Sequence, residues 1–541
     1  MVLLKDSEMN EKKYLSEIYL YALFVLFELV NFGYHYGAYY STALIPAIYH
    51  IMDPTLLAND IHAGHFPIYI RSLAWFIAQI GKTIPLPLVF FTFHVLSILL
   101  LFYAIRKLTE EILPDQPLFA WFTLFIIVFY HYMPGDNLII GGWILFEDNF
   151  YMYTLGYAIS LLALVCLAKR KIFLSAVIAA AALYVHLNIG QMIILLLVGI
   201  LLISRDPIQQ KLRNLLTFGI VSLIIGAPVL IFAFKDQILN IGQSAVADSV
   251  GPAFSEVIRF RHRQHLQPTF FPMINHIIFV LQIIITAYFF KLRKKSSWTN
   301  IDSVLFRASI VIVFLCGVGY LNEILRIGII DKFYLFRSSV ILAVITITYA
   351  CWIFWVTVCR KIKVDVIRVS ARYGLVMLSI ITIAAFYINY KSPRDTTGLR
   401  RKIFPGIYFD IKQTPIEEYI EKNTPKDAVF LVSPAYINFS TNTRRAQVVN
   451  WMAIPFNKDG WRDWYERIVD VSGGSVTVES MRNRHARDIW FVLAGPAFYA
   501  LPLDKLSEVA NKYHATYCVF KNTLPLKAEF QWEDMALYRL P

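Results

Sequence analysis

The chain has 541 residues, a length that would accommodate roughly three to four soluble domains. Its composition points elsewhere, because 57% of the residues are apolar and only 16% are charged, whereas a soluble protein is typically about 25% charged. The sequence therefore indicates an integral membrane protein and excludes a cytosolic enzyme or a disordered scaffold. Most of the net charge of +13 lies in short clusters between apolar runs, as topology signals do, so we expect no nucleic-acid partner.

The apolar runs predict eleven transmembrane helices. A span needs about 20 apolar residues to cross roughly 30 Å of hydrocarbon. From the N-terminus, the expected helices are Ile18–Tyr36, Leu86–Ile105, Leu118–Tyr132, Tyr151–Ala168, Ile172–Val185, Gly190–Ile203, Leu215–Phe234, Phe271–Phe290, Val304–Tyr320, Val340–Val358 and Tyr373–Tyr390. No cleavage site of small residues accompanies the first helix, so we expect a retained span and not a signal peptide.

The long apolar run at residues 172–204 is divided into two helices. A single helix over this run would measure about 50 Å at 1.5 Å per residue, well beyond the bilayer. It would also place the later basic clusters on the opposite side of the membrane. We therefore expect two short helices that meet at residues 186–190, where irregular backbone lines protein or a wet cavity.

Basic loops set the predicted orientation. With the N-terminus inside, every inner loop is rich in Lys and Arg: residues 106–107, 169–171, 205–213, 291–295 and 360–372. This is the pattern of cytoplasmic loops. An odd number of spans then puts everything after Tyr390 outside. We expect a transmembrane domain over residues 1–390 and an extracytoplasmic domain over residues 391–541.

The tail has the pattern of a small α/β domain. Thr414 is expected to cap a helix over residues 416–421, with Pro415 at its first position and Glu417 completing a capping box. The other predicted elements are helices over residues 459–471 and 503–513 and strands at 428–432, 517–520 and 536–540. The predicted fold is therefore an α-helical, multi-pass membrane protein with an α/β layer outside the membrane.

The first outer loop, residues 37–85, holds two candidate catalytic carboxylates, Asp53 and Asp60. On the functional interpretation, one of them takes a proton from an acceptor hydroxyl as a new bond forms. On the structural interpretation, both are turn or helix-cap residues, since each stands beside residues that favour turns. Residues 67–80 of the same loop have the apolar spacing of an amphipathic helix on the membrane surface.

The outer loop at residues 235–270 is basic, against the orientation trend. Its candidate substrate-binding residues are Arg259, Arg261, His262, Arg263 and His265. Guanidinium groups match phosphate oxygens in bidentate fashion, so the loop is a candidate for gripping a lipid-linked phosphate or diphosphate. The alternative is attraction to anionic lipid headgroups.

Four other residues complete the predicted substrate site. Glu147 and Asp148 lie in the second outer loop, Arg337 opens a helix from the outer side, and His186 lies in the divided run. Snorkelling is the default explanation of Arg337, and His186 is as readily a hydrogen-bonded core histidine. No metal or cofactor is expected, because the five cysteines form neither a disulfide framework nor a metal-binding pattern.

The tail also mixes basic and aromatic residues, as surfaces that contact sugars or phosphates do. These residues are Arg444, Arg445, Trp461, Arg462, Trp464 and Arg467. A solvated helix face explains the same pattern.

The whole arrangement resembles the GT-C superfamily of membrane glycosyltransferases. A cytoplasmic N-terminus, a long acidic first outer loop, about a dozen spans and an extracytoplasmic α/β tail are similar to protein O-mannosyltransferases, aminoarabinose transferases and oligosaccharyltransferases. Three stretches resemble poorly characterised bacterial multi-pass proteins of GT-C type: Asp53–Asp60, Arg259–Pro268 and Asn423–Ala428. The first loop lacks an adjacent acidic pair and the tail lacks the oligosaccharyltransferase Trp-Trp-Asp signature, which argues against transfer to asparagine.

The resemblance implies an enzyme of the bacterial inner membrane, with its N-terminus cytoplasmic and its C-terminal domain periplasmic or extracellular. It implies transfer of a sugar from a polyprenyl-phosphate-linked donor to a glycan, lipid or protein acceptor in cell-envelope polysaccharide assembly. Carried onto this sequence, the base is Asp60 or Asp53, and the arginines of the basic loop, with Arg337, stabilise the leaving phosphate. Two alternatives stay open: a non-catalytic factor that binds or transports lipid-linked glycan, and a polymerase or ligase that uses the Arg and His loop without a carboxylate base.

Overall fold

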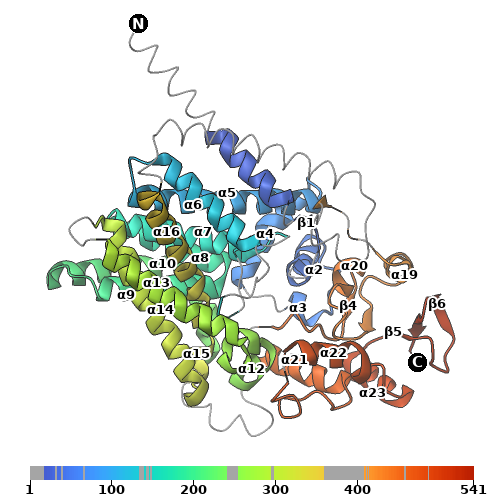
Figure 1. Cartoon of the computed structure of the whole chain (residues 1–541). Helices are drawn as coiled ribbons and strands as arrows, with labels where there is room; N and C mark the ends of the chain where they lie inside the picture. Colours follow the sequence, from blue (N-terminus) through green and yellow to red (C-terminus); the bar gives the residue numbers. More distant parts are fainter. Residues whose placement is uncertain are drawn as a thin grey trace.

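The computed structural model describes residues 17–30, 33–37, 41–64, 68–132, 139–141, 145–146, 149–239, 254–293, 298–358, 407–409, 411, 413–455, 458–484 and 486–540. Within these residues the protein is mostly helical, with a small sheet near the C-terminus. Figure 1 shows most helices of the first 358 residues gathered in one bundle, with the C-terminal unit, residues 407–540, beside one end of it.

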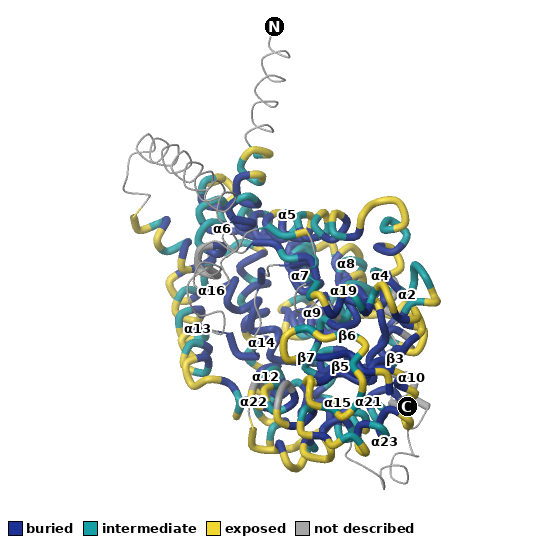
Figure 2. The backbone as a smooth tube through the Cα atoms, turned by 90° about the vertical axis from the view of Figure 1, so that its right-hand side faces the viewer, coloured by how far each residue is buried: buried dark blue, intermediate teal, exposed yellow. Residues whose placement is uncertain are grey.

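The bundle is built from helices of very different lengths. In chain order they are a helix over residues 17–30, α2 (Ser41–Met52), α3 (Ile61–Gly64), α4 (Ile68–Gly81), α5 (Leu86–Ile112), α6 (Pro117–Tyr132), α7 (Met152–Ala168), α8 (Ile172–Val185), α9 (Leu187–Leu202), α10 (Ile208–Leu239), α12 (Phe254–Leu266), α13 (Met273–Leu292), α14 (Asn300–Leu325), α15 (Gly328–Asp331) and α16 (Ser339–Thr357). Short 3₁₀ helices lie at Pro268–Phe270 and Leu335–Ser338. The backbone of α7 and α9 is largely buried in the centre of the bundle (Figure 2).

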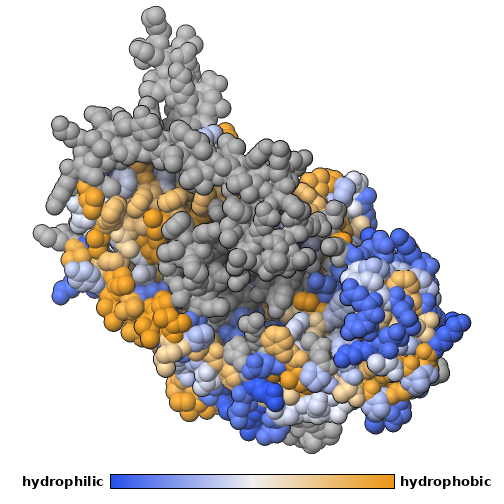
Figure 3. Space-filling view, turned by 45° about the vertical axis from the view of Figure 1, so that its right-hand side comes forward, coloured by the Kyte–Doolittle hydropathy of each residue, from blue (hydrophilic) through white to orange (hydrophobic). Residues whose placement is uncertain are grey.

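Five of the described helical segments are long and apolar enough to cross a membrane. They are Leu86–Ile112, Ile208–Ile231, Met273–Leu292, Asn300–Leu325 and Gly328–Thr357. The helices α10, α13 and α14 expose large apolar side chains, and in Figure 3 apolar residues gather on the bundle while hydrophilic residues gather on the C-terminal unit. Such helices are compatible with a membrane protein. The count of eleven spans stays a prediction, since the expected span at residues 373–390 lies outside the described residues.

The predicted division of the apolar run at residues 172–204 is confirmed. Between α8 and α9, His186 has extended backbone angles of φ −154° and ψ 108°, and its imidazole accepts a hydrogen bond from the backbone N–H of Ile189 at 3.5 Å. Close packing of the two helices requires Gly190, because a Cβ atom there would stand 2.5 Å from the backbone nitrogen of Leu183. The second helix begins three residues earlier than the sequence predicted.

The C-terminal unit contains a five-stranded mixed sheet in the order β4-β3-β5-β7-β6. The strands are β3 (Val429–Leu431), β4 (Ala446–Gln447), β5 (Tyr517–Lys521), β6 (Ala528–Trp532) and β7 (Met535–Arg539). Strands β4, β3 and β5 run parallel, and β5, β7 and β6 are antiparallel. The predicted strands at 428–432, 517–520 and 536–540 correspond to β3, β5 and β7, whereas β4 and β6 were not predicted.

Helices cover both faces of this sheet. They are α19 (Pro415–Asn423), α20 (Phe439–Thr443), α21 (Lys458–Val471), α22 (Ala486–Val492) and α23 (Leu503–Tyr513), followed in the case of α22 by a π-helical turn at Leu493–Ala497. Phe430 packs in one apolar cluster with α19 and α20, while Leu431, its neighbour along β3, belongs to the core shared with α21 and α23. Thr414 and Glu417 form the predicted capping box of α19.

Within the described residues, several contacts join the bundle to the C-terminal unit. The short strand β1 (Tyr34–His35) pairs in parallel with β2 (Ile407–Tyr408), and helix α2, which lies in the segment of residues 37–85, packs against α20 (Figure 1). Helix α12 contacts α15 of the bundle and α21 and α22 of the C-terminal unit. The amphipathic segment predicted at residues 67–80 is helical, as α4, and its place on a membrane surface stays a prediction.

Candidate functional site

A cavity of about 590 Å³ lies where the first loop, residues 37–85, the beginning of α5 and the C-terminal unit meet. Its lining residues are Tyr36, Tyr49, Met52, Asp53, Leu56, Gly81, Pro85, Leu86, Pro87, Phe409, Ile411, Gln413, Glu421, Thr441, Asn442 and Arg444. Apolar side chains come mainly from the first loop and α5, and most of the polar ones come from the C-terminal unit. The cavity therefore offers an apolar side next to a candidate membrane helix and a polar side next to the sheet domain, as an amphiphilic ligand requires.

Arg444 brings a positive charge into this cavity. It ends α20 in the left-handed conformation, with φ 55° and ψ 32°, which non-glycine residues adopt only at some cost and which is frequent at functional sites. Its guanidinium lies 5.0 Å from the centre of the Tyr49 ring, and its Nε is 3.3 Å from Oε1 of Glu421. The side chain stays half exposed, so it is accessible to an anion.

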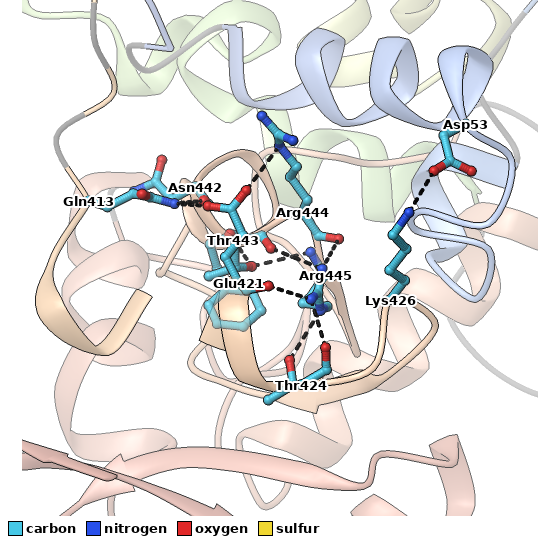
Figure 4. A network of polar contacts seen from close by, with 10 residues as sticks. Asp53, Gln413, Glu421, Thr424, Lys426, Asn442, Thr443, Arg444 and Arg445 are labelled. Atoms are coloured by element: carbon cyan, nitrogen blue, oxygen red, sulfur yellow. Dashed lines mark hydrogen bonds and ion pairs between the residues drawn. The ribbon is translucent and has the colours of Figure 1, made fainter. Parts of the chain in front are cut away.

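A hydrogen-bond network fixes the polar wall around Arg444 (Figure 4). Gln413 Nε2 donates to Oε2 of Glu421 and to the backbone oxygen of Asn442, both at 2.5 Å. Buried Glu417 accepts a hydrogen bond from Nδ2 of Asn442 at 2.7 Å. Behind the wall, Arg445 is buried and donates to backbone oxygens of residues 421, 424, 443 and 444. The loop that carries Arg444 is therefore held from both sides.

Asp53 supplies a negative charge on the side of the first loop. It accepts hydrogen bonds from the hydroxyl and the backbone N–H of Thr55, at 2.6 and 3.0 Å, and pairs with Nζ of Lys426 at 3.2 Å (Figure 4). These donors, with Thr55 first, lower the pKa of Asp53. The carboxylate is consequently charged at neutral pH, and it ties the first loop to the C-terminal unit.

Asp60 has a different environment and does not line the described cavity. It is buried, and its Oδ1 accepts the backbone N–H groups of His62 and Ala63, each at 2.9 Å, at the beginning of α3. Burial raises the pKa of Asp60. Asp60 is therefore a helix-cap residue that also hydrogen-bonds to the backbone of Gln447 in the C-terminal unit, whereas Asp53 is both a turn residue and a cavity residue.

The three arginines of the basic loop are buried against protein acceptors and do not line the described cavity. Arg259 makes a bidentate ion pair with Asp331 at 2.8 and 3.0 Å. Arg261 donates to the backbone oxygen of Trp451 at 2.6 Å, and Arg263 donates to backbone oxygens of residues 481, 482 and 484. These contacts fix α12 between the bundle and the C-terminal unit.

Four of the predicted substrate residues come together elsewhere, in a buried cluster of aromatic rings. The guanidinium of Arg337 lies over the rings of Tyr153 and Tyr334, at 4.7 and 4.3 Å. The Tyr153 ring contacts His186 at a centroid distance of 4.2 Å, and the Tyr334 hydroxyl is 2.9 Å from Nδ1 of His262. His265, whose ring centre is 6.1 Å from that of His262, hydrogen-bonds to the backbone oxygen of Gly141.

The remaining predictions concern Glu147, Asp148 and metals. Both acidic residues lie outside the described residues. Among the residues that the structure describes, no group of three His, Cys, Asp or Glu side chains is arranged to hold a metal ion. Thr441 lines the cavity, but its Oγ1 is buried and has no hydrogen-bond partner within the described part of the chain.

Sequence reasoning missed Glu421, Gln413 and Tyr49 as site residues. It noted Arg444 only as part of a mixed basic and aromatic set, with a solvated helix face as an equal explanation. Part of the wall comes from α20, which has five residues, too few for a recognisable helical periodicity. The only available signal was the concentration of basic and aromatic residues itself.

One comparison with known proteins bears on this wall. Residues 412–471 match a protein family described as a domain of unknown function, DUF6798. No curated protein matches the chain. The matched segment supplies five residues to the lining of the cavity: Gln413, Glu421, Thr441, Asn442 and Arg444.

Proposed function

We propose that the protein is a membrane-embedded glycosyltransferase that moves a sugar from a polyprenyl-phosphate-linked donor to an acceptor hydroxyl at this cavity. One observation carries the proposal: the cavity is lined by a carboxylate, Asp53, from the first outer loop and by an accessible guanidinium, Arg444, from the C-terminal unit. Its apolar lining beside the beginning of α5 suits a lipid chain, and its amides, hydroxyls and aromatic rings suit a sugar.

The proposed step is a displacement at the anomeric carbon. The acceptor oxygen forms a bond to this carbon while the bond to the phosphate oxygen breaks, and the electron pair of that bond stays on the phosphate. Asp53 takes the acceptor proton, as a positioned general base. Arg444 stabilises the charge on the leaving phosphate, a role in which a preorganised cation is most effective.

The wider setting belongs to the same proposal. We place the protein in a bacterial inner membrane with a cytoplasmic N-terminus, so that the C-terminal unit and the cavity face the extracytoplasmic side. The acceptor is a glycan, a lipid or a protein of the cell envelope. The support for this orientation is the basic character of the predicted inner loops.

The test is a transfer assay with purified full-length protein and a radiolabelled polyprenyl-phosphate sugar. Asp53→Asn should reduce turnover by about 10²- to 10⁴-fold, the usual contribution of a general base. Arg444→Gln should reduce it by about 10²-fold or more. Asp504→Asn and Arg482→Gln change exposed residues that lie outside the cavity lining, and they should retain full turnover.

Three outcomes would count against this proposal in different ways. Full turnover in both cavity variants would remove the assigned roles. Turnover that is lost only with His262→Ala or His265→Ala would favour the Arg and His loop as the catalytic region. Saturable donor binding without any turnover in the unmodified protein would favour a non-catalytic carrier of lipid-linked glycan.

A further inference from the structure

Three guanidinium groups come together at the end of the bundle that is remote from the cavity. Arg170 lies between α7 and α8, Arg205 lies between α9 and α10, and Arg307 lies two turns into α14. Arg170 and Arg205 are exposed, and Arg307 is half-buried. Both exposed arginines act electrostatically on Arg307, as does one carboxylate, Asp206. The three arginines make up the basic cluster.

Close packing of α9 against α14 brings two of these arginines to the same level. A Cβ atom at Gly199 in α9 would stand 2.7 Å from Cγ1 of Val311 in α14. Val311 follows Arg307 by about one helical turn, and Arg205 lies just beyond the last residue of α9. The chain therefore leaves α9 beside the part of α14 that carries Arg307.

The third arginine reaches the same end of the bundle from α7. Lys169, which precedes Arg170, forms an ion pair with Glu111 at the end of α5, at 2.7 Å. The cavity adjoins Leu86 at the beginning of α5. The helix between Leu86 and Glu111 spans about 37 Å at 1.5 Å per residue, more than the roughly 30 Å of a hydrocarbon core. The basic cluster and the cavity therefore lie at opposite ends of a candidate membrane span.

The positive charge of the basic cluster exceeds the negative charge beside it. Within the residues that the structure describes, none of the three guanidinium groups forms an ion pair, and Nε of Arg307 donates to the backbone oxygen of Ser303 in its own helix at 3.0 Å. The nearby carboxylates of Glu111 and Asp302 are engaged with other basic residues. Like charges repel, and a charged group within an apolar helix is costly unless it is paired. An anion from outside the chain would stabilise this arrangement.

An apolar groove of about 550 Å³ begins next to Asp206 and follows the outer face of α10. Its described lining is Gln209, Leu212, Arg213, Leu216, Thr217, Ile220 and Val221. Leu212, Leu216 and Ile220 are exposed. From Gln209 to Val221 the helix rises about 18 Å, which is close to one leaflet, half of the roughly 30 Å core. The groove therefore suits one hydrocarbon chain.

We propose that the basic cluster and the groove of α10 bind one anionic phospholipid of the bilayer, with its phosphate on the arginines and an acyl chain along the helix. Guanidinium groups match phosphate oxygens in bidentate fashion, and basic pockets between membrane helices bind anionic headgroups. In the predicted orientation this lipid belongs to the cytoplasmic leaflet. The site goes beyond the proposed function, because it shares no residue with the cavity.

The experiment counts bound lipid by native mass spectrometry of the full-length protein released from detergent micelles. Phosphatidylglycerol and phosphatidylcholine with the same acyl chains are titrated separately, and they differ in net charge. Phosphatidylglycerol should bind at least about tenfold more tightly. Glycerol phosphate, which has a phosphate but no acyl chain, should not displace it at equal concentration.

Three variants separate a defined site from general attraction. Arg307→Gln should weaken phosphatidylglycerol binding about tenfold or more, because a hydrogen bond between charged groups is lost. Arg205→Gln guards against a folding defect, since this residue is exposed outside the helices, and it should weaken binding about threefold or more. Lys107→Gln is the matched control at the same end of the bundle. It removes a positive charge that pairs with Glu110 at 2.8 Å and should change binding by less than about twofold.

Three results would overturn the inference. The first is equal binding of the two lipids by the unmodified protein. The second is an equal loss of binding in Lys107→Gln and in both cluster variants, which would reflect general attraction to a basic surface. The third is displacement of the lipid by glycerol phosphate, which would indicate a site for free phosphate. None of these results depends on turnover, so the proposed function is tested separately.

Discussion

Arg444 and Arg445 are adjacent in the sequence but have opposite environments. The Arg444 side chain is half exposed at the cavity, with one ion pair to Glu421. The Arg445 side chain is buried and donates to the hydroxyl of Thr424 and to four backbone oxygens. One arginine therefore serves the cavity and the other stabilises the wall that carries it.

The two arginines should respond differently to removal. Arg445→Leu should lower the free energy of unfolding by about 2–4 kcal/mol, because it leaves several buried acceptors without donors. Arg444→Leu should lower it by about 1 kcal/mol at most, since a half-exposed ion pair contributes little. Thermal unfolding in detergent micelles measures both. Equal losses in the two variants would contradict the assignment.

His265 predicts a pH dependence of stability. An unperturbed imidazole has a pKa of about 6.5, whereas burial, followed by the charge of Arg337, lowers the pKa of folded His265 to about 3. The unfolded chain therefore binds one more proton than the folded chain between these values, and stability falls as the pH drops from about 6.5 towards 3. Above pH 6.5 this contribution is fully present.

The measurement compares melting temperatures at about pH 7 and pH 5. His265→Gln retains a donor for the backbone oxygen of Gly141 and does not titrate, so it should lose less stability on acidification than the unmodified protein. Carboxylate groups titrate equally in both proteins and cancel in the comparison. If both proteins lose the same stability between about pH 7 and pH 5, the pKa of His265 is not lowered by folding, and the prediction is wrong.

The sequence identified the cavity carboxylate as one of two candidates and could not separate them. Asp53 and Asp60 both stand beside turn-forming residues, and what distinguishes them is the distant part of the chain that each one contacts. Lys426 holds Asp53 at the cavity, whereas Asp60 is buried and bound by the backbone N–H groups of His62 and Ala63 and of the distant Gln447. A separation of more than 370 residues between Asp53 and Lys426 leaves no trace in the local sequence.

At the level of the elements, the space around a glycine shows whether a neighbouring helix packs closely against it. A Cβ atom at Gly190 would lie 2.5 Å from the backbone nitrogen of Leu183 in α8, whereas a Cβ atom at Gly219 in α10 would meet nothing within 4 Å. A Cβ atom does not fit at Gly190, because the nearest atom belongs to the backbone of α8 and cannot move aside as a flexible side chain can. Gly219 faces open space.

This contrast gives a matched pair of substitutions. Gly190→Ala should destabilise the protein by about 1–3 kcal/mol through overpacking. Gly219→Ala should be neutral or should stabilise by up to about 1 kcal/mol, because alanine is the better helix former. Thermal unfolding in the same detergent compares them. Similar stabilities for the two variants would mean that α8 and α9 are not packed as described.

Elements with a local signal were predictable, and elements held by distant partners were not. The capping box of Thr414 and Glu417 located α19, and the excessive length of one apolar run located the break at His186. The short elements α20 and β4 have five and two residues and carry too little periodicity. The segment of α12 was predicted to bind phosphate because its charge runs against the orientation trend and guanidinium groups match phosphate oxygens. In the structure its arginines instead donate to acceptors in the bundle and in the C-terminal unit.

For the whole molecule, the cavity depends on segments that are remote in the chain. The first loop, the beginning of α5 and residues 409–444 each contribute side chains to its lining. The sequence predicted the membrane helices and the α/β tail separately, since each has its own composition. Their contact surface has no such signature, and for that reason the polar wall of the site could not be predicted.

The most direct test of the central claim asks where a donor binds. The measurement is photo-crosslinking of the full-length protein with a polyprenyl-phosphate sugar that carries a diazirine on the sugar, followed by mapping of the labelled peptides by mass spectrometry. We expect labels on residues 41–56 and 409–444, and we expect Arg444→Gln to abolish them while Arg482→Gln does not. Labels concentrated on residues 254–266 and 335–338, with none at the cavity, would contradict the account.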